Sequence, residues 1–350
     1  MTKVLVTGSS GLIGNETVRF FAKKKFEVIG IDNNFRKLFF GQDGDTESIS
    51  SHLQSDFDNF SFNNGDIRDA GFINTLFENH KGAIDLIIHA AAQPSHDWAA
   101  RNPLLDFEVN SLGTLNLLEA ARLFMPNAVF IYMSTNKVYG DISNSFEYSE
   151  GENRYSLERT NPFFQYGFNE SLPIDQSLHS LFGVSKLSAD LLTQEYGRYF
   201  GLKTTVLRGG CLSGPTHQGA ELHGFLSYLV KCAYQNKHYT VFGYKGKQVR
   251  DNLHSIDVVQ AFWEIFNDPK VGEVYNIGGS IYSNISIREA INYLIEKSFN
   301  LSHTFKDDSR LGDHKWWISD VRKFQTHYPN WEVTRNAFDI IDETVMALKS

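Results

Sequence analysis

The stretch TGSSGLIG, residues 7–14, is the clearest indication of the fold in this sequence. It places three glycines at intervals of three residues, at Gly8, Gly11 and Gly14. A run of β-branched and aliphatic residues precedes it, and a helical pattern of apolar residues follows over 12–24. Glycine lets the backbone turn sharply and approach a pyrophosphate, while the helix N-terminus offers N–H groups and partial positive charge. A strand, a glycine turn and a helix in this order predict a dinucleotide-binding site.

The second predicted strand, FEVIGID at 26–32, ends in an acidic residue, Asp32, 18 residues after Gly14. An acidic side chain at this place accepts hydrogen bonds from both ribose hydroxyls and repels a 2′-phosphate. Arg36 favours the opposite cofactor, because an arginine near the ribose can bind the phosphate of NADP. We expect NAD, since Asp32 stands at the strand end itself.

Short apolar runs alternate with helical patterns through the first half of the chain. The runs lie at 3–8, 26–32, 60–69, 84–92 and 128–135, and the helical patterns lie at 12–24, 70–79 and 104–124. This alternation predicts an α/β fold, a Rossmann-type doubly wound parallel sheet covered by helices on both faces, with a smaller α/β substrate-binding lobe.

The domain boundaries follow from where this rhythm stops. We expect residues 1–207 to form the NAD-binding Rossmann domain, with 251–278 returning to it. Residues 208–250 and 279–350 are expected to form the substrate-binding lobe. The stretch 141–178, rich in Asn, Ser, Glu and aromatic residues, is expected to be a long functional loop or lid.

Composition excludes several classes of function. A formal net charge of −8 over 350 residues argues against general binding to nucleic acid or to an anionic membrane. Only Cys211 and Cys232 are present, without the spacing of a disulfide framework or of a metal site. No targeting segment and no apolar run of about 18 residues is visible. We therefore expect a cytoplasmic protein that binds a small anion and no metal.

Five further motifs identify a family. They are GDIRD at 65–69, HAAAQ at 89–93, VNSLGTLNLLEA at 109–120, STNKVYG at 134–140 and GKQVRDNLHSIDV at 246–258. With the glycine turn, they resemble the extended short-chain dehydrogenase/reductase family over nearly the whole chain. The resemblance implies that NAD is bound by Gly8, Ser10, Gly11, Leu12, Ile13, Gly14, Asp32, Asn33, Asp66, Ile67, Ala90, Ala91, Ala92, Asn110 and Lys186.

The motif STNKVYG narrows the activity that the resemblance implies. In the family, Thr135 is the position of the Ser or Thr that hydrogen-bonds the reacting sugar oxygen. Nucleotide-sugar 4,6-dehydratases carry Asp-Glu at the next two positions, where this chain has Asn136 and Lys137. These side chains cannot act in the same way as the acid and base that elimination of water needs, so dehydration is disfavoured.

Together with GKQVRD, this motif is most similar to the CDP-paratose 2-epimerases. That similarity implies C2 epimerisation of a nucleotide-linked deoxysugar, with a CDP-sugar favoured, in the making of surface polysaccharide. It also implies a homodimer formed through helices 103–124 and 183–200. The expected substrate-binding residues are Gln93, His96, Asp97, Ser134, Asn136, Arg250 and Arg310.

The family's YxxxK pair departs from its pattern in HSLFGVSK, residues 179–186. Lys186 is present, but Phe182 stands where the acid/base tyrosine is expected, and losing such a group typically costs about 10²- to 10⁴-fold in rate. The expected catalytic positions are therefore Thr135, Lys186, Lys137 and Phe182 as the place of the missing tyrosine.

Three explanations for the missing hydroxyl stay open. Another group transfers the proton, the phenylalanine was introduced to trap substrate, or the protein binds NAD or a nucleotide sugar without turnover. The candidate substitutes are Lys137, Thr135, His96, Asp97, His179 and Tyr166. A nucleotide-sugar dehydrogenase, reductase or decarboxylase remains an alternative to the epimerase.

Overall fold

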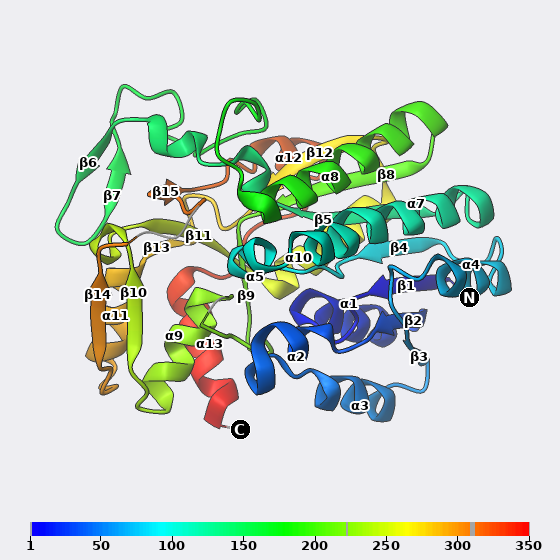
Figure 1. The fold of residues 1–350 in the computed structure, drawn as a ribbon, viewed down its shortest axis with the longest axis horizontal. Helices are drawn as coiled ribbons and strands as arrows, with labels where there is room; N and C mark the ends of the chain where they lie inside the picture. The colour runs from blue at the N-terminus through cyan, green and yellow to red at the C-terminus, as the bar shows by residue number, and fades with distance from the viewer. Residues whose placement is uncertain (1, 222, 309–311, 350) are drawn as a thin grey trace. The chain divides into compact units, whose positions relative to one another are not determined.

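The computed structural model describes residues 2–221, 223–308 and 312–349, and they form two compact units. The first unit comprises Met1–Thr135, Leu181–Arg208 and Val258–Tyr275. The second comprises Asn136–Ser180, Gly209–Asp257 and Asn276–Ser350. Each unit has its own helices and strands (Figure 1). Each also has its own buried apolar residues.

A seven-stranded sheet organises the first unit. Its spatial order is β12-β8-β5-β4-β1-β2-β3, and the pairs from β5 to β3 are parallel. The strands are β1 (Lys3–Thr7), β2 (Glu27–Asp32), β3 (Phe60–Asn64), β4 (Leu86–His89), β5 (Val129–Thr135), β8 (Lys203–Gly209) and β12 (Glu273–Ile277). The order reverses direction between β1 and β4, and ligands of open α/β sheets bind at the carboxyl ends of strands beside such a reversal.

Helices cover both faces of this sheet. They are α1 (Leu12–Lys23), α2 (Phe35–Phe40), η1 (Gly41–Gly44), α3 (Glu47–Asp56), α4 (Ala70–Asn79), α5 (His96–Arg101), α6 (Pro103–Phe107), η2 (Glu108–Leu112), α7 (Gly113–Phe124), α8 (Ser180–Phe200) and α10 (Ser255–Asn267). On one face, α4, α7 and α8 share an apolar cluster that includes Phe77, Leu117 and Ala189. Phe21 of α1 and Trp263 of α10 pack on each other elsewhere in the unit, with ring centroids 6.3 Å apart. The prediction of a doubly wound parallel α/β fold is confirmed.

One predicted helix is interrupted. The pattern over 104–124 predicts a continuous helix, but the structure inserts a π-helical turn, η2, between α6 and α7. A π-turn adds one residue to the helical repeat and therefore changes the direction of the side chains around it. Sequence periodicity cannot reveal a single such turn, because the apolar pattern resumes after it.

The second unit is built from smaller sheets. Its strands are β6 (Tyr148–Glu150), β7 (Tyr155–Leu157), β9 (Cys211–Ser213), β10 (Tyr239–Phe242), β11 (Val249–His254), β13 (Asn284–Ser286), β14 (His303–Lys306) and β15 (Trp316–Trp317). Its helices are η3 (Asn136–Tyr139), η4 (Ile142–Ser145), α9 (Phe225–Tyr234), η5 (Tyr244–Gly246), α11 (Ile287–Glu296), α12 (Arg322–His327) and α13 (Ala337–Lys349). β11 pairs with β9, β13 and β15, and α9, α11 and α13 share one apolar core.

The units divide the chain differently from the sequence-based division in one long segment and at the ends of 251–278, where 251–257 and 276–278 belong to the second unit. Residues 136–180, expected within the first domain, belong to the second unit. Backbone contacts show why: Tyr155 N donates to Lys247 O at 2.9 Å, and Phe168 N donates to Ile318 O at 2.7 Å. This segment carries η4 and the β6–β7 hairpin where a loop was expected.

Candidate active site

Two glycines of the turn between β1 and α1, Gly8 and Gly14, stand where a side chain has no room. Gly8 has φ of +68°, and a Cβ atom there would lie 2.8 Å from Ala91 N. A Cβ on Gly14 would overlap the carbonyl oxygen of Gly8. Gly8 and Gly14 thus let the turn, the first helix and the end of the neighbouring strand approach one another closely, as the sequence predicts.

Asp32 is fixed by backbone donors at the end of β2. Its Oδ2 accepts from Ser10 N at 2.9 Å, and its Oδ1 accepts from Asn34 N at 2.8 Å. Burial raises the pKa of Asp32, and these N–H groups oppose that rise. Burial also lowers the pKa of Arg36 to about 10, although the negative charge of Asp32 acts to raise it.

A cavity of about 350 Å³ opens beside this carboxylate. It is lined by Ser10, Asp32, Asn33, Asn34, Thr46, Glu47, Ser50, Ser51, Phe62 and Asn64. Its mostly small and polar lining, with Asp32 and Glu47 as its carboxylates, suits a ribose more than a phosphate at the 2′ position.

The third and fourth strands end beside the same region. Asp66 follows β3, accepts from Asn33 Nδ2 at 3.2 Å and pairs with Arg68 at 2.7 Å. Although burial works to raise the pKa of Asp66, the hydrogen bonds and charge of Arg68 lower it overall. Ile67 is buried, and it lies against Gly113, where a Cβ would come within 2.6 Å of it.

These residues fit NAD. The hydroxyls of Ser9 and Ser10 are buried in the glycine turn and have no hydrogen-bond partner within the described ranges. Buried polar groups are normally satisfied, so the hydroxyl of Ser10, which lines the cavity beside Asp32, suits a bound group that completes it. Ala90, Ala91 and Ala92 follow β4, and Leu12 and Ile13 begin α1. We expect these residues to hold the dinucleotide.

Helix α8 carries the turn that corresponds to YxxxK. Phe182 is 6% exposed and lies one helical turn before Lys186. Lys186 Nζ donates to Met133 O at 2.7 Å and lies 4.3 Å above the ring of Tyr132. Burial lowers the pKa of Lys186 to about 7, while Asp190 and Asp106 favour its charged form.

A buried polar junction links α8 to the segment after β4. Asn110, on the π-turn, donates through Nδ2 to Gln93 O at 3.0 Å and to Ser185 Oγ at 3.0 Å. Gln93 N donates back to Asn110 Oδ1 at 2.9 Å. Gln93 Nε2 donates to Asp106 Oδ1 at 2.6 Å. Asn110 and Gln93, expected to bind cofactor and substrate, therefore direct these amide groups toward the protein and hold the surrounding backbone in place.

The remaining predicted residues of the first unit lie at the ends of β5 and at the start of α5. Thr135 is half-buried at the last position of β5. Ser134 donates to Asp190 Oδ2 at 2.6 Å, which commits its hydroxyl proton to a buried carboxylate. His96 and Asp97 are half-buried in the first turn of α5.

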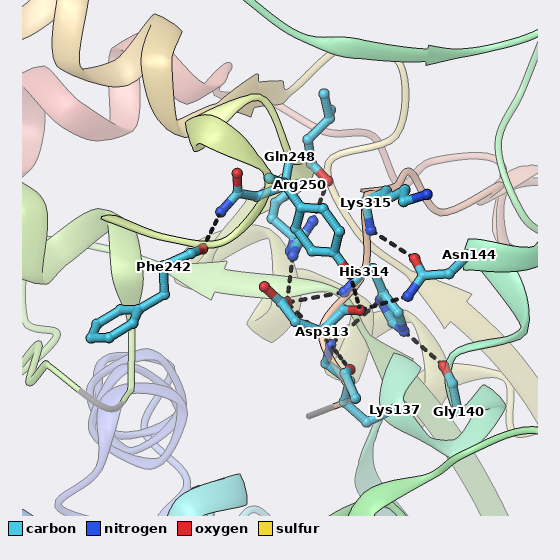
Figure 2. Close-up of polar contacts among 12 residues, drawn as sticks. Lys137, Gly140, Asn144, Phe242, Gln248, Arg250, Asp313, His314 and Lys315 are labelled. Atoms are coloured by element: carbon cyan, nitrogen blue, oxygen red, sulfur yellow. Dashed lines mark hydrogen bonds and ion pairs between the residues drawn. The ribbon is translucent and has the colours of Figure 1, made fainter. Parts of the chain in front are cut away.

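Lys137 and Arg250 meet in the second unit around one carboxylate (Figure 2). Arg250 donates to Asp313 Oδ1 at 2.5 Å, and Lys137 Nζ lies 3.8 Å from the same oxygen. Lys137 also donates to Gly312 O at 2.9 Å. Two cations therefore share one carboxylate, and the charges of these three groups sum to one positive unit.

A histidine completes this cluster. His314 Nε2 lies 2.8 Å from Gly140 O, which accepts only, so Nε2 carries the proton of that hydrogen bond. His314 Nδ1 lies 3.5 Å from Lys137 Nζ. Burial lowers the pKa of His314 well below its ordinary value, and the neighbouring cations act in the same direction. Asn136 is also buried in this unit, and Arg310 lies outside the described residues.

Lys137 gives a prediction for pH and stability. Burial lowers its pKa to about 8 from the ordinary 10.5, with Asp313 opposing. Between these two values the unfolded chain binds more protons at Lys137 than the folded one, so this residue makes the free energy of unfolding rise with pH. The slope is at most about 1.4 kcal/mol per pH unit.

Urea unfolding at pH 7, 8, 9 and 10 measures this effect. The difference in unfolding free energy between the wild type and Lys137→Met is expected to shift in favour of the wild type above pH 8. Lys237→Met, at an exposed lysine of the same unit, is the control and should show no such shift. A difference independent of pH contradicts the depressed pKa of Lys137.

Some residues of the site give no signal in the sequence. Asp106, Ser185 and Asp190 are buried polar residues within helices, and Asp313 lies in a loop. Lys186 and Asp190 are four residues apart on a predicted helix, so the sequence could have indicated that their side chains lie on the same face. Nothing in the spacing indicates the pairing of Arg250 with Asp313.

The glycine turn, Asp32 and the lysine turn of α8 define a dinucleotide-binding enzyme of the Rossmann class. Residues 4–278 match the NAD dependent epimerase/dehydratase family, and the chain belongs to that family. The predictions of NAD as cofactor and of an enzyme of this family are thereby confirmed. Among the described residues, no helix combines the length and the apolar character needed to cross a membrane.

Two relatives and one solved structure place the chain within this family. CDP-paratose 2-epimerase of Salmonella typhi is 34% identical over 346 residues, covering 96% of each chain. A dTDP-glucose 4,6-dehydratase of Escherichia coli is 30% identical over 332 residues, covering 90% of this chain and 84% of that one. A tyrosine-to-phenylalanine mutant of UDP-glucuronic acid 4-epimerase from Bacillus cereus, with a fluorinated UDP-sugar and NAD, has a TM-score of 0.78 at 25% identity and 99% coverage of each chain.

Proposed function

We propose that the protein epimerises a nucleotide-linked sugar, with C2 of a CDP-linked deoxysugar as the reacting carbon. The similarity to CDP-paratose 2-epimerase over 96% of both chains carries this proposal. Asn136 and Lys137 support it against dehydration, because the amide of Asn136 does not titrate near neutral pH and cannot act as a general acid or base, and the amine of Lys137 lies in an ion-pair cluster.

The chemistry that bound NAD supplies is reversible acceptance of a hydride from the sugar carbon. Epimerisation needs this hydride transfer in both directions, first from the sugar carbon and then back to it, so the reaction consumes no oxidant or reductant. The chain must hold the cofactor through both steps, and the close-packed glycine turn with Asp32 suits tight binding. As the resemblance implies, Lys186 is proposed to bind the nicotinamide ribose and Thr135 to bind the reacting sugar oxygen.

The cluster of Lys137, Arg250 and Asp313 is proposed to bind the substrate diphosphate. Its excess positive charge calls for an anion, and a guanidinium binds phosphate oxygens in two-pronged fashion. Asp313 holds Arg250 in place at 2.5 Å. The burial of Lys137, 15% exposed, strengthens its attraction for a phosphate compared with a lysine in water.

The test is an assay of the purified protein with a CDP-linked 3,6-dideoxyhexose and NAD in D₂O and in H₂O. We expect the C2 epimer, with the C2 hydrogen of the substrate retained in the product because the hydride returns to the same carbon. Loss of that hydrogen to solvent, or loss of water from the sugar, contradicts the proposal. UDP- and dTDP-linked sugars serve as controls for the nucleotide.

A second candidate is a protein that binds NAD and a nucleotide sugar without turnover. Phe182 is the observation that favours this candidate, because a phenylalanine ring carries no hydroxyl that could act as acid or base. Calorimetric binding of the CDP-sugar with no epimer formed after prolonged incubation would support this candidate and contradict the epimerase.

We also propose a homodimer formed through α7 and α8. Both helices expose large apolar side chains, and monomeric surfaces rarely expose such side chains in a contiguous group. The exposed residues are Leu112, which immediately precedes α7, and Leu123, Leu181, Val184, Leu191, Tyr199 and Phe200. Dimer formation covers this surface with a second copy of the same two helices.

Light scattering tests the dimer. Leu191→Arg, at a side chain 46% exposed on α8, is expected to convert the dimer to a monomer, because association would bury an unpaired charge. Val271→Arg, 51% exposed and outside both helices, is the matched control and should leave the dimer intact. A wild type that is monomeric at micromolar concentration contradicts the proposal.

A further inference from the structure

The ring of Phe182 has a titratable neighbour within its own unit. The centroids of the His96 and Phe182 rings lie 4.9 Å apart, with an angle of 62° between their planes. Phe182 is buried, whereas His96 is half-buried, so the imidazole lies at the more open side of this pair. An imidazole is the side chain best suited to proton transfer near neutral pH.

The backbone beside His96 is held firmly. Ser95 caps α5, with its hydroxyl accepting from Trp98 N at 3.3 Å, and its own N–H donates to Gln93 Oε1 at 2.5 Å. Gln93 Nε2 donates to Ser95 O at 2.9 Å. The two contacts between Gln93 and Ser95 are buried, so they hold the backbone at the start of α5.

The same hydrogen bonds reach the lysine turn of α8. Gln93 is bound to Asn110, and Asn110 donates to Ser185, which stands between Phe182 and Lys186. A chain of buried polar contacts therefore connects Ser95, the residue before His96, to the turn of α8 that carries Phe182 and Lys186.

Helix α5 is also attached to the segment that follows the NAD site. Trp98 Nε1 donates to Phe39 O at 2.8 Å, and the two rings lie 5.1 Å apart. Phe39 is on α2, which begins three residues after Asp32. Helix α5, which begins at His96, is thus attached through Trp98 to α2.

We propose that His96 performs the proton transfer for which the chain has no tyrosine hydroxyl at 182. The inference rests on the proposed function. The imidazole accepts the proton of the sugar hydroxyl while the carbon of that hydroxyl loses its hydride and becomes a ketone carbon. When the hydride returns to the other face of the ketone, the imidazolium gives the proton back to the oxygen, so protons and electrons balance over the cycle.

Phe182 has a defined part in this arrangement. Its ring occupies the volume of a tyrosine ring and packs edge-to-face with His96, and it carries no hydroxyl that would compete for the sugar oxygen. In this proposal the imidazole of His96 replaces the tyrosine hydroxyl that is missing at Phe182. Two substitutions, one at each position, would restore the usual arrangement.

Reversal is the experiment. We would measure epimerisation of the CDP-sugar by the wild type, His96→Gln, Phe182→Tyr and the double variant His96→Gln/Phe182→Tyr. His96→Gln is expected to lower kcat by about 10²- to 10⁴-fold with little change in KM. Restoring the tyrosine in the double variant should recover at least about tenfold of that loss, because Lys186 is already in place to lower the pKa of the new phenol.

Control measurements separate the outcomes. His80→Gln, at the end of α4, should leave kcat unchanged, and the melting temperature and NAD affinity of His96→Gln should match the wild type. The imidazole NMR signals of His96 should shift when CDP-sugar is added to the NAD complex. Unchanged kcat in His96→Gln, or no gain in the double variant, overturns the inference. If the wild type has no epimerase activity but its His96 signals still shift, the proposed function is contradicted and not the inference. If the His96 signals do not shift, the inference itself is overturned.

Discussion

Gly14→Ala is expected to abolish NAD binding and to lower the free energy of unfolding by about 3 kcal/mol or more. The added Cβ would overlap backbone atoms of Gly8 and Ser9, which cannot rotate away as a flexible side chain can. Overpacking a well-packed region typically costs about 1–3 kcal/mol, and overlap with backbone lies at the upper end or beyond it. The start of α1 must then move away from β1, which removes the N–H groups that bind the pyrophosphate.

Gly11→Ala is the matched control within the same turn. Its Cβ would meet only the Gly8 carbonyl oxygen, at 3.3 Å, and its φ of −74° suits an alanine. Urea unfolding of the NAD-free proteins should therefore show a large loss for Gly14→Ala and a loss below about 1 kcal/mol for Gly11→Ala. Calorimetry with NAD measures binding separately. Equal stability of the two variants would contradict the close approach of α1 to Gly8.

The fold could be predicted from the sequence because its signals are local. The glycine turn, the acid at the end of β2 and the alternation of apolar runs with helical patterns all act over a few residues. The order of the central strands then follows from the rules for parallel sheets. The NAD site is built from these same strand ends, so its prediction needed little beyond the fold.

The polar interior could not be predicted, because it depends on pairs far apart in the chain. Asn110 joins Gln93 to Ser185 only because a π-turn changes its direction, and the apolar pattern on either side conceals that turn. The pairing of His96 with Phe182 is likewise a contact between segments on different helices. A sequence shows that a hydroxyl is missing at 182, but only the fold shows which imidazole lies beside that ring.

The assignment of 136–180 failed for a related reason. A polar and aromatic stretch without periodicity is typical of a loop, yet here its aromatic residues pack in the second unit. Phe168 lies under Trp317, with ring centroids 5.0 Å apart, and Phe146 stacks on Phe168. Aromatic contacts of this kind, which no sequence repeat indicates, attach the segment to β15.

Asp190→Ala is expected to destabilise the protein by about 3–5 kcal/mol. Asp190 is fully buried on α8 and accepts from Arg208 Nε and Nη2, both at 2.9 Å. Ser134 and Gln194 donate to the same carboxylate, each at 2.6 Å. Removing one partner of a buried pair leaves the other charge without compensation, which is far more costly than losing a surface pair.

Two further variants separate this cause from a simple loss of volume. Glu195→Ala breaks the Glu195–Arg198 pair on the same helix, where the side chains are 61% and 54% exposed, and should cost no more than about 1 kcal/mol. Asp190→Leu/Arg208→Met removes both buried charges and should recover most of the stability lost in Asp190→Ala, because apolar replacements of a buried pair are often neutral. Urea unfolding measures all three. If the double variant is less stable than Asp190→Ala, the uncompensated charge of Arg208 is not the cause of the loss.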